Sequence, residues 1–252
     1  VLVEATSTEE VAAVVKLCNE NKVPVTPSGA RTGLVGGAVS IGGGVMISLT
    51  KMNKILGYDK ENFVVKIQSG VLLNDLAQDA EKQGLLYPGL FYPPDPGEKA
   101  SSIGGNIATN AGGMRAVKYG CTRDYVRAMT VVLPTGEIVK LGATVSKTSS
   151  GYSLLNLMIG SEGTLGIITE LTLKVIPAPK SVISLIIPYE NLEDCIATVP
   201  QFFMHHLAPQ ALEFMEKEVV MDTEKFLGKQ VYPKELEGTE IGAYLLATFD
   251  GN

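Results

Sequence analysis

The stretch SSIGGNIATNAGGMRAVKYG, residues 101–120, places five glycines and two asparagines in twenty positions and carries no obvious nucleophile, base or metal cluster. Its glycine pairs, Gly104–Gly105 and Gly112–Gly113, remove side chains where a large flat ligand would press against the backbone. Asn106, Thr109 and Asn110 offer hydrogen-bond donors and acceptors. The pattern favours a wall for a heterocycle with a polar edge, and the alternative is an irregular surface loop.

Two further glycine-rich loops accompany this stretch. TPSGARTGLVGG, residues 26–37, follows a predicted strand, and its glycines permit backbone conformations that aim successive amides at one phosphate or pyrophosphate, with Arg31 as an added charge. The loop is neither a Walker A sequence nor a Rossmann fingerprint, and a tight turn is the competing interpretation. KTSSGYSLLNLMIGSEGTLGIITE, residues 147–170, places Glu162 among glycines and is suited to close the far side of the same ligand.

Composition narrows the function classes. Apolar residues make up 45% of the 252 residues and charged residues 19%, so the chain can bury a core in one or two domains. With a formal net charge of −6 and scattered basic residues, no nucleic-acid partner is predicted. Cys18, Cys121 and Cys195 are too few and too distant for a disulfide framework or a paired-cysteine zinc site. This cysteine usage fits a reducing compartment, so a cytoplasmic protein is expected. No apolar run reaches membrane-spanning length and no signal peptide is visible.

Local patterns predict alternating helices and strands. Thr6 or Ser7 is expected to cap a first helix, and a second helix is expected to close at Gly84. Residues 134–137, PTGE, predict a hairpin turn. The predicted helices cover residues 6–22, 71–84 and 191–203. The predicted strands are residues 23–27, 45–49, 63–67, 129–133, 137–141, 166–179, 181–189 and 243–249. From about residue 182 the strand and helix order indicates the opening of a second domain.

The order and spacing of four segments resemble one family. TPSGARTGLVGG, PPDPGEKASSIGGNIATNAGG, KYGCTRDYV and GSEGTLGIITELTLKV are similar to the FAD-binding domain of FAD-linked oxidases in the vanillyl-alcohol oxidase superfamily, which is of the PCMH type. Within it, the glycolate oxidase subunit and D-lactate dehydrogenase branch is most similar. The resemblance implies an α+β protein, with residues 1–180 as an FAD-binding domain of two α+β subdomains and FAD in the cleft between them. Residues 181–252 are expected to form an incomplete substrate-side α+β cap domain.

The resemblance also implies a set of cofactor-binding residues. The pyrophosphate would be cradled by Ser28, Gly29, Ala30, Arg31, Thr32, Gly33 and Leu34. The flavin, ribityl and adenosine parts would be lined by Pro94, Asp95, Gly104, Gly105, Ala108, Thr109, Asn110, Gly113 and Gly120. The shell would be completed by Glu162, Gly166, Ile167 and Ile168.

Departures from the family pattern concern cofactor attachment and catalysis. No histidine lies in the flavin motifs, and Cys121 is better interpreted as a packing residue, so FAD is expected to be non-covalent. His205 and His206 are adjacent, point different ways on any regular element and lack a partner carboxylate at ligand spacing, so no metal site is predicted. The family's histidine-rich segment has no counterpart before Asn252. We therefore expect an N-terminal fragment and assign no catalytic residue.

The resemblance implies oxidation of a small 2-hydroxy acid, of the D-lactate or glycolate type, by hydride transfer to flavin. Electrons would pass to a second acceptor such as an electron-transferring flavoprotein, a quinone, a cytochrome or oxygen. Peripheral attachment to a membrane stays open. A non-catalytic FAD-binding electron-relay subunit is the alternative, and a nicotinamide-dependent reductase on the same cofactor fold is a third option.

Overall fold

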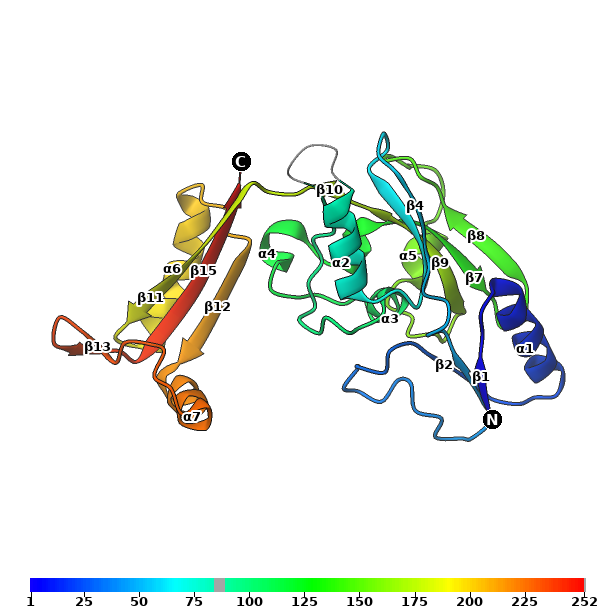
Figure 1. The fold of residues 1–252 in the computed structure, drawn as a ribbon, viewed down its shortest axis with the longest axis horizontal. Helices are drawn as coiled ribbons and strands as arrows, with labels where there is room; N and C mark the ends of the chain where they lie inside the picture. Colours follow the sequence, from blue (N-terminus) through cyan, green and yellow to red (C-terminus); the bar gives the residue numbers. More distant parts are fainter. Residues whose placement is uncertain (84–88, 252) are drawn as a thin grey trace. The chain divides into compact units, whose positions relative to one another are not determined.

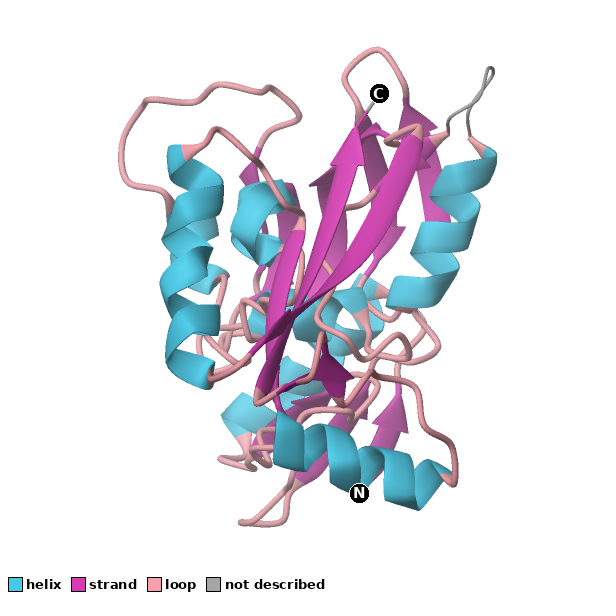
Figure 2. Ribbon diagram, turned by 90° about the vertical axis from the view of Figure 1, so that its left-hand side faces the viewer, coloured by secondary structure: helices cyan, strands magenta, loops and turns pink. Residues whose placement is uncertain are grey.

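The computed structural model describes residues 1–83 and 89–251, which divide into two compact units. The first unit comprises Val1–Gly113 and Gly120–Ala178, and the second comprises Met114–Tyr119 and the chain from Pro179 onward (Figure 1). Both helices and strands build the molecule (Figure 2), so the predicted α+β class is confirmed. The sequence predicts one domain over residues 1–180. The structure instead groups the short segment 114–119 with the second unit.

A small parallel sheet and one helix open the first unit. The sheet has the strand order β1-β3-β2, from β1 (Leu2–Glu4), β2 (Val25–Ser28) and β3 (Val45–Ser48). Helix α1 (Thr8–Glu20) begins at the N-cap Ser7, whose hydroxyl accepts a hydrogen bond from the amide of Glu10 at 3.2 Å. Its apolar face packs on Ile47 of β3, and the same core includes Val132 and Ile167 from the larger sheet.

An antiparallel five-stranded sheet is the largest sheet of the first unit. Its order is β4-β5-β9-β7-β8. The strands are β4 (Ile55–Asp59), β5 (Val64–Gln68), β7 (Val126–Val132), β8 (Ile138–Gly142) and β9 (Ile167–Lys174). The β7–β8 hairpin turns through residues 134–137, where the amide of Gly136 donates to the carbonyl of Leu133 at 2.8 Å, which confirms the predicted turn.

Short helices and a small ladder surround this sheet. The helices are α2 (Leu73–Lys82), α3 (Ile103–Ala108) and α5 (Leu154–Met158), with a 3₁₀ turn η1 (Thr122–Tyr125). The ladder pairs β6 (Leu90–Phe91) with β10 (Ile176–Pro177). The single strand predicted over 166–179 is two strands in the structure, β9 and β10. Buried Val175 separates them, and its amide donates a hydrogen bond to the carbonyl of Phe63. The helix end predicted at Gly84 lies outside the described residues.

The second unit is an antiparallel sheet with helices. Its main sheet has the order β11-β15-β12, from β11 (Ser181–Tyr189), β12 (Ala211–Glu216) and β15 (Ala243–Gly251). The helices are α4 (Ala116–Tyr119), α6 (Leu192–Met204) and α7 (Lys217–Leu227), and β13 (Glu235–Leu236) pairs with β14 (Thr239–Glu240). Helix α6 begins at Asn191, which caps the amide of Asp194, and buries Cys195 and Phe202 against β15.

Candidate functional site

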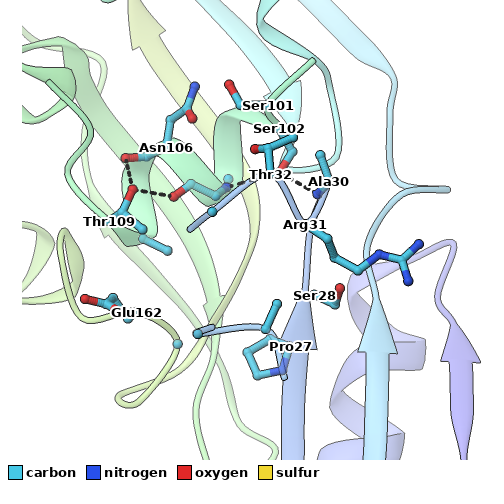
Figure 3. A pocket seen from close by; sticks show the side chains of 18 of the residues that line it. Pro27, Ser28, Ala30, Arg31, Thr32, Ser101, Ser102, Asn106, Thr109 and Glu162 are labelled. Carbon is cyan, nitrogen blue, oxygen red and sulfur yellow. Dashed lines mark hydrogen bonds between the residues drawn. The ribbon is translucent and has the colours of Figure 1, made fainter. Parts of the chain in front are cut away.

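A cavity of about 470 Å³ lies within the first unit, in the size range of small-molecule and cofactor sites. It is lined mainly by three groups of residues that are distant in sequence and that Figure 3 shows together, with Leu49 and Ser69 in addition. The end of β2 and the loop after it contribute residues 27–39. The approach to α3 and the helix itself contribute most of residues 96–109. The segment that enters β9 contributes Glu162, Gly163 and residues 166–168.

Ser102 joins the first two groups. Its hydroxyl accepts a hydrogen bond from the amide of Ala30 at 3.3 Å and caps α3 through the amide of Gly105 at 3.4 Å (Figure 3). A side-chain carbon at Gly29 would collide with this hydroxyl, so only glycine permits the approach. Next in the loop, Arg31 has a left-handed backbone with φ of 61°. The serine hydroxyl therefore sets the distance between the phosphate-type loop and the glycine-rich helix.

Helix α3 replaces the loop that the glycine content of residues 103–108 predicts. Gly104 lies on the backbone of β5's end, where an added Cβ would be 2.5 Å from the Cβ of Ser69. Close to the other end of the helix, the Thr109 hydroxyl donates to the carbonyl of Gly105 at 3.1 Å (Figure 3). Glycine disfavours an isolated helix, but here its small size permits the packing that stabilises this one.

Ser69 belongs to the cavity lining and has a buried side-chain hydroxyl. The residue is 2% exposed, and its hydroxyl has no hydrogen-bond partner among the residues that the structure describes. A buried unpaired hydroxyl costs free energy, so such atoms in native proteins usually have a ligand, ion or water as partner. Ser69 thus has an unpaired hydroxyl beside the cavity, covered by its surroundings in the described structure.

The third group is joined to α3 through its backbone. The amide of Glu162, a residue with φ of 52°, donates to the carbonyl of Ala108 at 2.8 Å, and the amide of Gly160 donates to Ile107 at 3.0 Å. Gly163 packs on Pro27, where a Cβ would be 2.6 Å from the ring. These contacts hold the carboxylate of Glu162 in the cavity lining, opposite Arg31 in the view of Figure 3.

The structure brings most of the predicted site residues together. Those that line the cavity are Ser28, Gly29, Ala30, Arg31, Thr32, Gly33, Leu34, Gly104, Gly105, Ala108, Thr109, Glu162, Gly166, Ile167 and Ile168. The described lining does not include Pro94, Asp95, Asn110, Gly113 and Gly120.

Contacts within the first unit account for several residues outside that lining. Asn110 accepts a hydrogen bond from the amide of Arg123 at 3.0 Å, and Asp95 forms an ion pair with Lys99. A Cβ at Gly113 would overlap the backbone of Asp95, and one at Gly120 would overlap the side chain of Asp124. The observed role of these residues is to shape the chain around the cavity.

Several residues that line the cavity were not among the cofactor-binding residues predicted from the sequence. They are Pro27, Val35, Gly36, Gly37, Ala38, Val39, Leu49, Ser69, Pro96, Glu98, Ser101, Ser102 and Gly163. Asn106, which the sequence singled out as a hydrogen-bonding residue of the wall, also lines the cavity. Gly36 and Gly37 belong to the quoted phosphate-type loop, which is a usable signal. Ser69 gives none, because a serine after a strand resembles any turn residue.

Other residues singled out in the sequence have structural surroundings. Ser7 is the N-cap of α1, and Cys121 is the N-cap of η1, where its amide donates to Asp124 at 2.8 Å. His205 is the C-cap of α6, and His206 follows it with φ of 60°. Within residues 1–83 and 89–251, no group of three His, Cys, Asp or Glu side chains is arranged to hold a metal ion. No helix of that part of the chain is both long and apolar enough to cross a bilayer.

The arrangement suits a dinucleotide with a flat ring system. Tight glycine approaches, an unpaired serine hydroxyl, backbone amides and a single arginine among the described lining residues match the mixture of pyrophosphate oxygens, hydroxyls and aromatic edges of FAD. The family models agree. Residues 1–142 match the model described as FAD binding domain, and residues 178–252 match the C-terminal domain of FAD linked oxidases. The chain therefore belongs to the FAD-linked oxidases, and the FAD prediction is confirmed.

Individual relatives lie in the branch that the motifs indicate. The chain is 96% identical over 252 residues to the D-lactate dehydrogenase of Anaerostipes hadrus, covering 100% of this chain and 52% of that protein. It is 40% identical over 221 residues to the glycolate oxidase subunit GlcD of Bacillus subtilis (strain 168), covering 87% and 46%. The chain thus spans about half the length of the curated relatives it matches.

A solved structure supports the fold. An alkyldihydroxyacetonephosphate synthase superposes with a TM-score of 0.82 at 25% identity, over 99% of this chain and 49% of that one. The predicted PCMH-type FAD-binding fold is confirmed by this likeness together with the FAD binding domain match.

Proposed function

We propose that the protein is an FAD-dependent dehydrogenase that oxidises a small 2-hydroxy acid of the D-lactate or glycolate type. The observation that carries the proposal is the 96% identity to a D-lactate dehydrogenase over the whole chain, joined to a cavity built from the family's three loops. Glycolate stays in the substrate class because of the likeness to the glycolate oxidase subunit. Electrons pass on to a second acceptor, proposed as an electron-transferring flavoprotein, a quinone or a cytochrome.

The described residues have the task of binding and orienting the cofactor. Bound FAD supplies the flavin ring that accepts a hydride from the substrate's α-carbon. The amides of residues 28–34 and the Arg31 guanidinium favour the anionic pyrophosphate. Glu162 disfavours phosphate at the other side of the cavity, because like charges repel, and accepts hydrogen bonds from N–H or hydroxyl groups there. Ser69 offers a further hydrogen-bonding hydroxyl.

Most of the cofactor-binding residues inferred from the family remain in this proposal as direct contacts. Asp95, Asn110, Gly113 and Gly120 are proposed to take part by holding the loop that carries α3, which their contacts within the first unit support. Pro94 lies outside the described lining and receives no role. FAD is proposed to be non-covalent, since the lining contains neither histidine nor cysteine among its described residues. The catalytic base is assigned to no residue of this chain.

The test is an anaerobic visible spectrum of the protein expressed from its complete reading frame. Flavin bands at about 375 and 450 nm are expected, and D-lactate should bleach them as the cofactor is reduced. L-lactate is the matched control, because it has the same groups with the opposite stereochemistry, and glycolate tests the range of the class.

Each outcome has a distinct meaning. Bleaching by D-lactate or glycolate supports the dehydrogenase, and the more reactive acid identifies the substrate. Bands that none of the three acids reduces, but that a chemical reductant bleaches, favour the electron-relay subunit. A colourless protein that FAD does not reconstitute overturns the proposal.

A further inference from the structure

A six-residue excursion interrupts the loop at the cavity. Residues 101–113 and Gly120–Ala178 belong to the first unit, but Met114–Tyr119, which includes α4 (labelled in Figure 1), belongs to the second. The chain therefore passes between the units at three places: after Gly113, after Tyr119 and after Ala178. The N-terminal end of this excursion, at Gly113, is five residues from the end of α3, and α3 lines the cavity.

The first unit holds the excursion at both ends. Gly113 has φ of 150° and lies so close to the backbone of Asp95 that no side chain fits, and Gly120, with φ of 80°, packs on the side chain of Asp124. Only glycine readily adopts such backbone angles. These two positions therefore fix where the chain leaves and re-enters the first unit.

A buried carboxylate of the second unit holds the middle of the excursion. The side chain of Asp250, on β15, is 0% exposed and forms an ion pair with the ammonium of Lys118. Tyr119 donates its phenolic hydrogen to the same carboxylate at 2.6 Å. Lys118 also donates to the backbone carbonyl of Asp250 at 3.2 Å. Helix α4 packs beside β12 as well.

The contacts of Asp250 with Lys118 and Tyr119 hold α4 at one position on the second unit. A buried carboxylate costs free energy unless charged and hydrogen-bonded partners compensate it, and Asp250 takes both partners from consecutive residues of one short segment. Lys118 keeps 26% of its side chain exposed, so the anchor is buried mainly at the carboxylate. A surface ion pair would contribute little, whereas this geometry gives one specific position.

We propose that Asp250 is a positioning residue, which through Lys118 and Tyr119 holds residues 114–119 and so supports the chain that leads, through Gly113, to α3 and the cofactor wall. The proposal rests on the proposed function, because it assigns the cavity to FAD. The second unit from Pro179 onward matches the C-terminal domain of FAD-linked oxidases, whereas residues 114–119 lie within the FAD binding domain match. We expect a change at Asp250 to reach the cofactor wall through residues 114–119. Asp250 is not a catalytic residue in this scheme.

The test compares Asp250→Ala, Asp250→Asn and Lys118→Met in the protein expressed from its complete reading frame. Amide hydrogen exchange is measured over residues 101–120, with flavin circular dichroism and steady-state kinetics at full FAD occupancy. We expect exchange at residues 114–119 to accelerate about tenfold or more in Asp250→Ala, because the anchoring bonds are lost. Asp250→Asn, which still accepts the Tyr119 hydrogen bond, should show a smaller effect.

The matched control is Glu224→Gln. Glu224 is also a nearly buried carboxylate of the second unit that pairs with a lysine, but it holds residues 231–234 instead of α4. Glu224→Gln should weaken the second unit without changing exchange over 114–119 or the flavin signal. Asp250→Ala should alter the flavin dichroism and lower kcat about tenfold with a smaller change in KM, because the loss is one of orientation.

The possible results distinguish three claims: that Asp250 anchors residues 114–119, that this anchor positions the cofactor wall, and that the cavity binds FAD. Unchanged exchange over 114–119 in both Asp250→Ala and Lys118→Met overturns the anchor. Faster exchange with unchanged flavin dichroism and kcat leaves an anchor but overturns the positioning role, as does an equal flavin effect in Glu224→Gln. A wild-type protein that binds no FAD overturns the proposed function and the positioning role together, while the exchange data still decide whether Asp250 anchors the segment. Failure of Asp250→Ala to fold leaves the decision to Asp250→Asn and Lys118→Met.

Discussion

Gly104 and Ser69 show how single residues define the cavity. Gly104 brings α3 against the end of β5, and an added Cβ there would meet both the Cβ of Ser69 at 2.5 Å and its carbonyl at 2.8 Å. Ser69 in turn has a buried hydroxyl with no partner in the described part of the chain. Gly104 permits close packing because it has no side chain, and Ser69 has a buried hydroxyl without a described partner beside the cavity.

Gly104→Ala should destabilise the protein and release FAD. The methyl group would push α3 away from the β5 end, and overpacking of this kind costs about 1–3 kcal/mol. Thermal unfolding and the ratio of flavin to protein absorbance measure the two effects. Gly112→Ala is the control in the same loop, because a Cβ there meets nothing within 4 Å among the described residues and the backbone has no positive φ. Equal behaviour of the two variants would contradict the packing argument.

Ser69→Ala should separate stability from cofactor affinity. Removal of an unpaired buried hydroxyl should leave the apoprotein as stable as before or slightly more stable, whereas FAD affinity should fall about tenfold if the hydroxyl bonds to it. Fluorescence titration with FAD gives the affinity, and thermal unfolding of the apoprotein gives the stability. Ser40→Ala is the matched variant, since its hydroxyl is also buried and unpaired among the described residues but lies outside the described lining. A loss of FAD affinity as large in Ser40→Ala would remove the special role of Ser69.

At the scale of elements, α7 shows how a helix end is joined to the loop that follows it. The helix stops at Gly228, which adopts φ of 63°. The loop then returns, so that the Glu224 carboxylate accepts the amides of Val231 at 2.8 Å and Tyr232 at 2.9 Å and pairs with Lys234. The Lys234 hydrogen bond, followed by those two amides, lowers the pKa of Glu224 to about 2 from an ordinary value of 4.5.

This pKa shift predicts a pH dependence of the second unit. A carboxyl with a lower pKa in the folded state than in the unfolded state stabilises the fold above pH 4.5 and loses that contribution as the pH falls toward 2. Glu224→Gln should therefore lower stability at pH 6 and reduce the loss between pH 4.5 and 2. Urea unfolding followed by circular dichroism at several pH values measures this. Glu218→Gln, at an exposed position on the same helix, should retain the wild-type dependence, and a wild-type profile for Glu224→Gln would contradict the assignment.

For the whole molecule, the cavity lies within one of two units, so cofactor binding should protect one unit selectively. Added FAD is expected to slow amide exchange over residues 28–39, 101–109 and 162–168, with less effect on the β11–β15–β12 sheet. At about a hundredfold excess over Kd, linkage adds about 2.7 kcal/mol to the stability of the binding unit. Riboflavin is the control: without a pyrophosphate it should protect residues 28–39 much less. Protection confined to the second unit would contradict the placement of the site.

Much of the site can be predicted from the sequence because its glycines and polar residues are grouped in three short motifs. Their composition indicates close backbone approach, and their order matches one family, so Arg31, Thr109 and Glu162 are identified before any coordinates. The hairpin turn and the Ser7 cap follow from local chemistry in the same way. Ser69 and Ser102 are different. Ser102 contacts Ala30 and Ser69 contacts Gly104, in each case more than 30 positions away in the sequence. The residues next to a serine do not indicate such a distant contact.

What the amino-acid sequence determined by itself is the fold class, the cofactor and the loops that serve it, because local backbone freedom and motif order are properties of neighbouring residues. Only the tertiary structure decided that glycine-rich residues 103–108 form a helix, that a serine hydroxyl stays unpaired beside the cavity, and that residues 114–119 belong to the second unit. These outcomes depend on contacts between distant segments, such as Gly104 with Ser69 and Lys118 with Asp250. Long-range packing and burial, which no local pattern encodes, determine which of the locally possible conformations is stable.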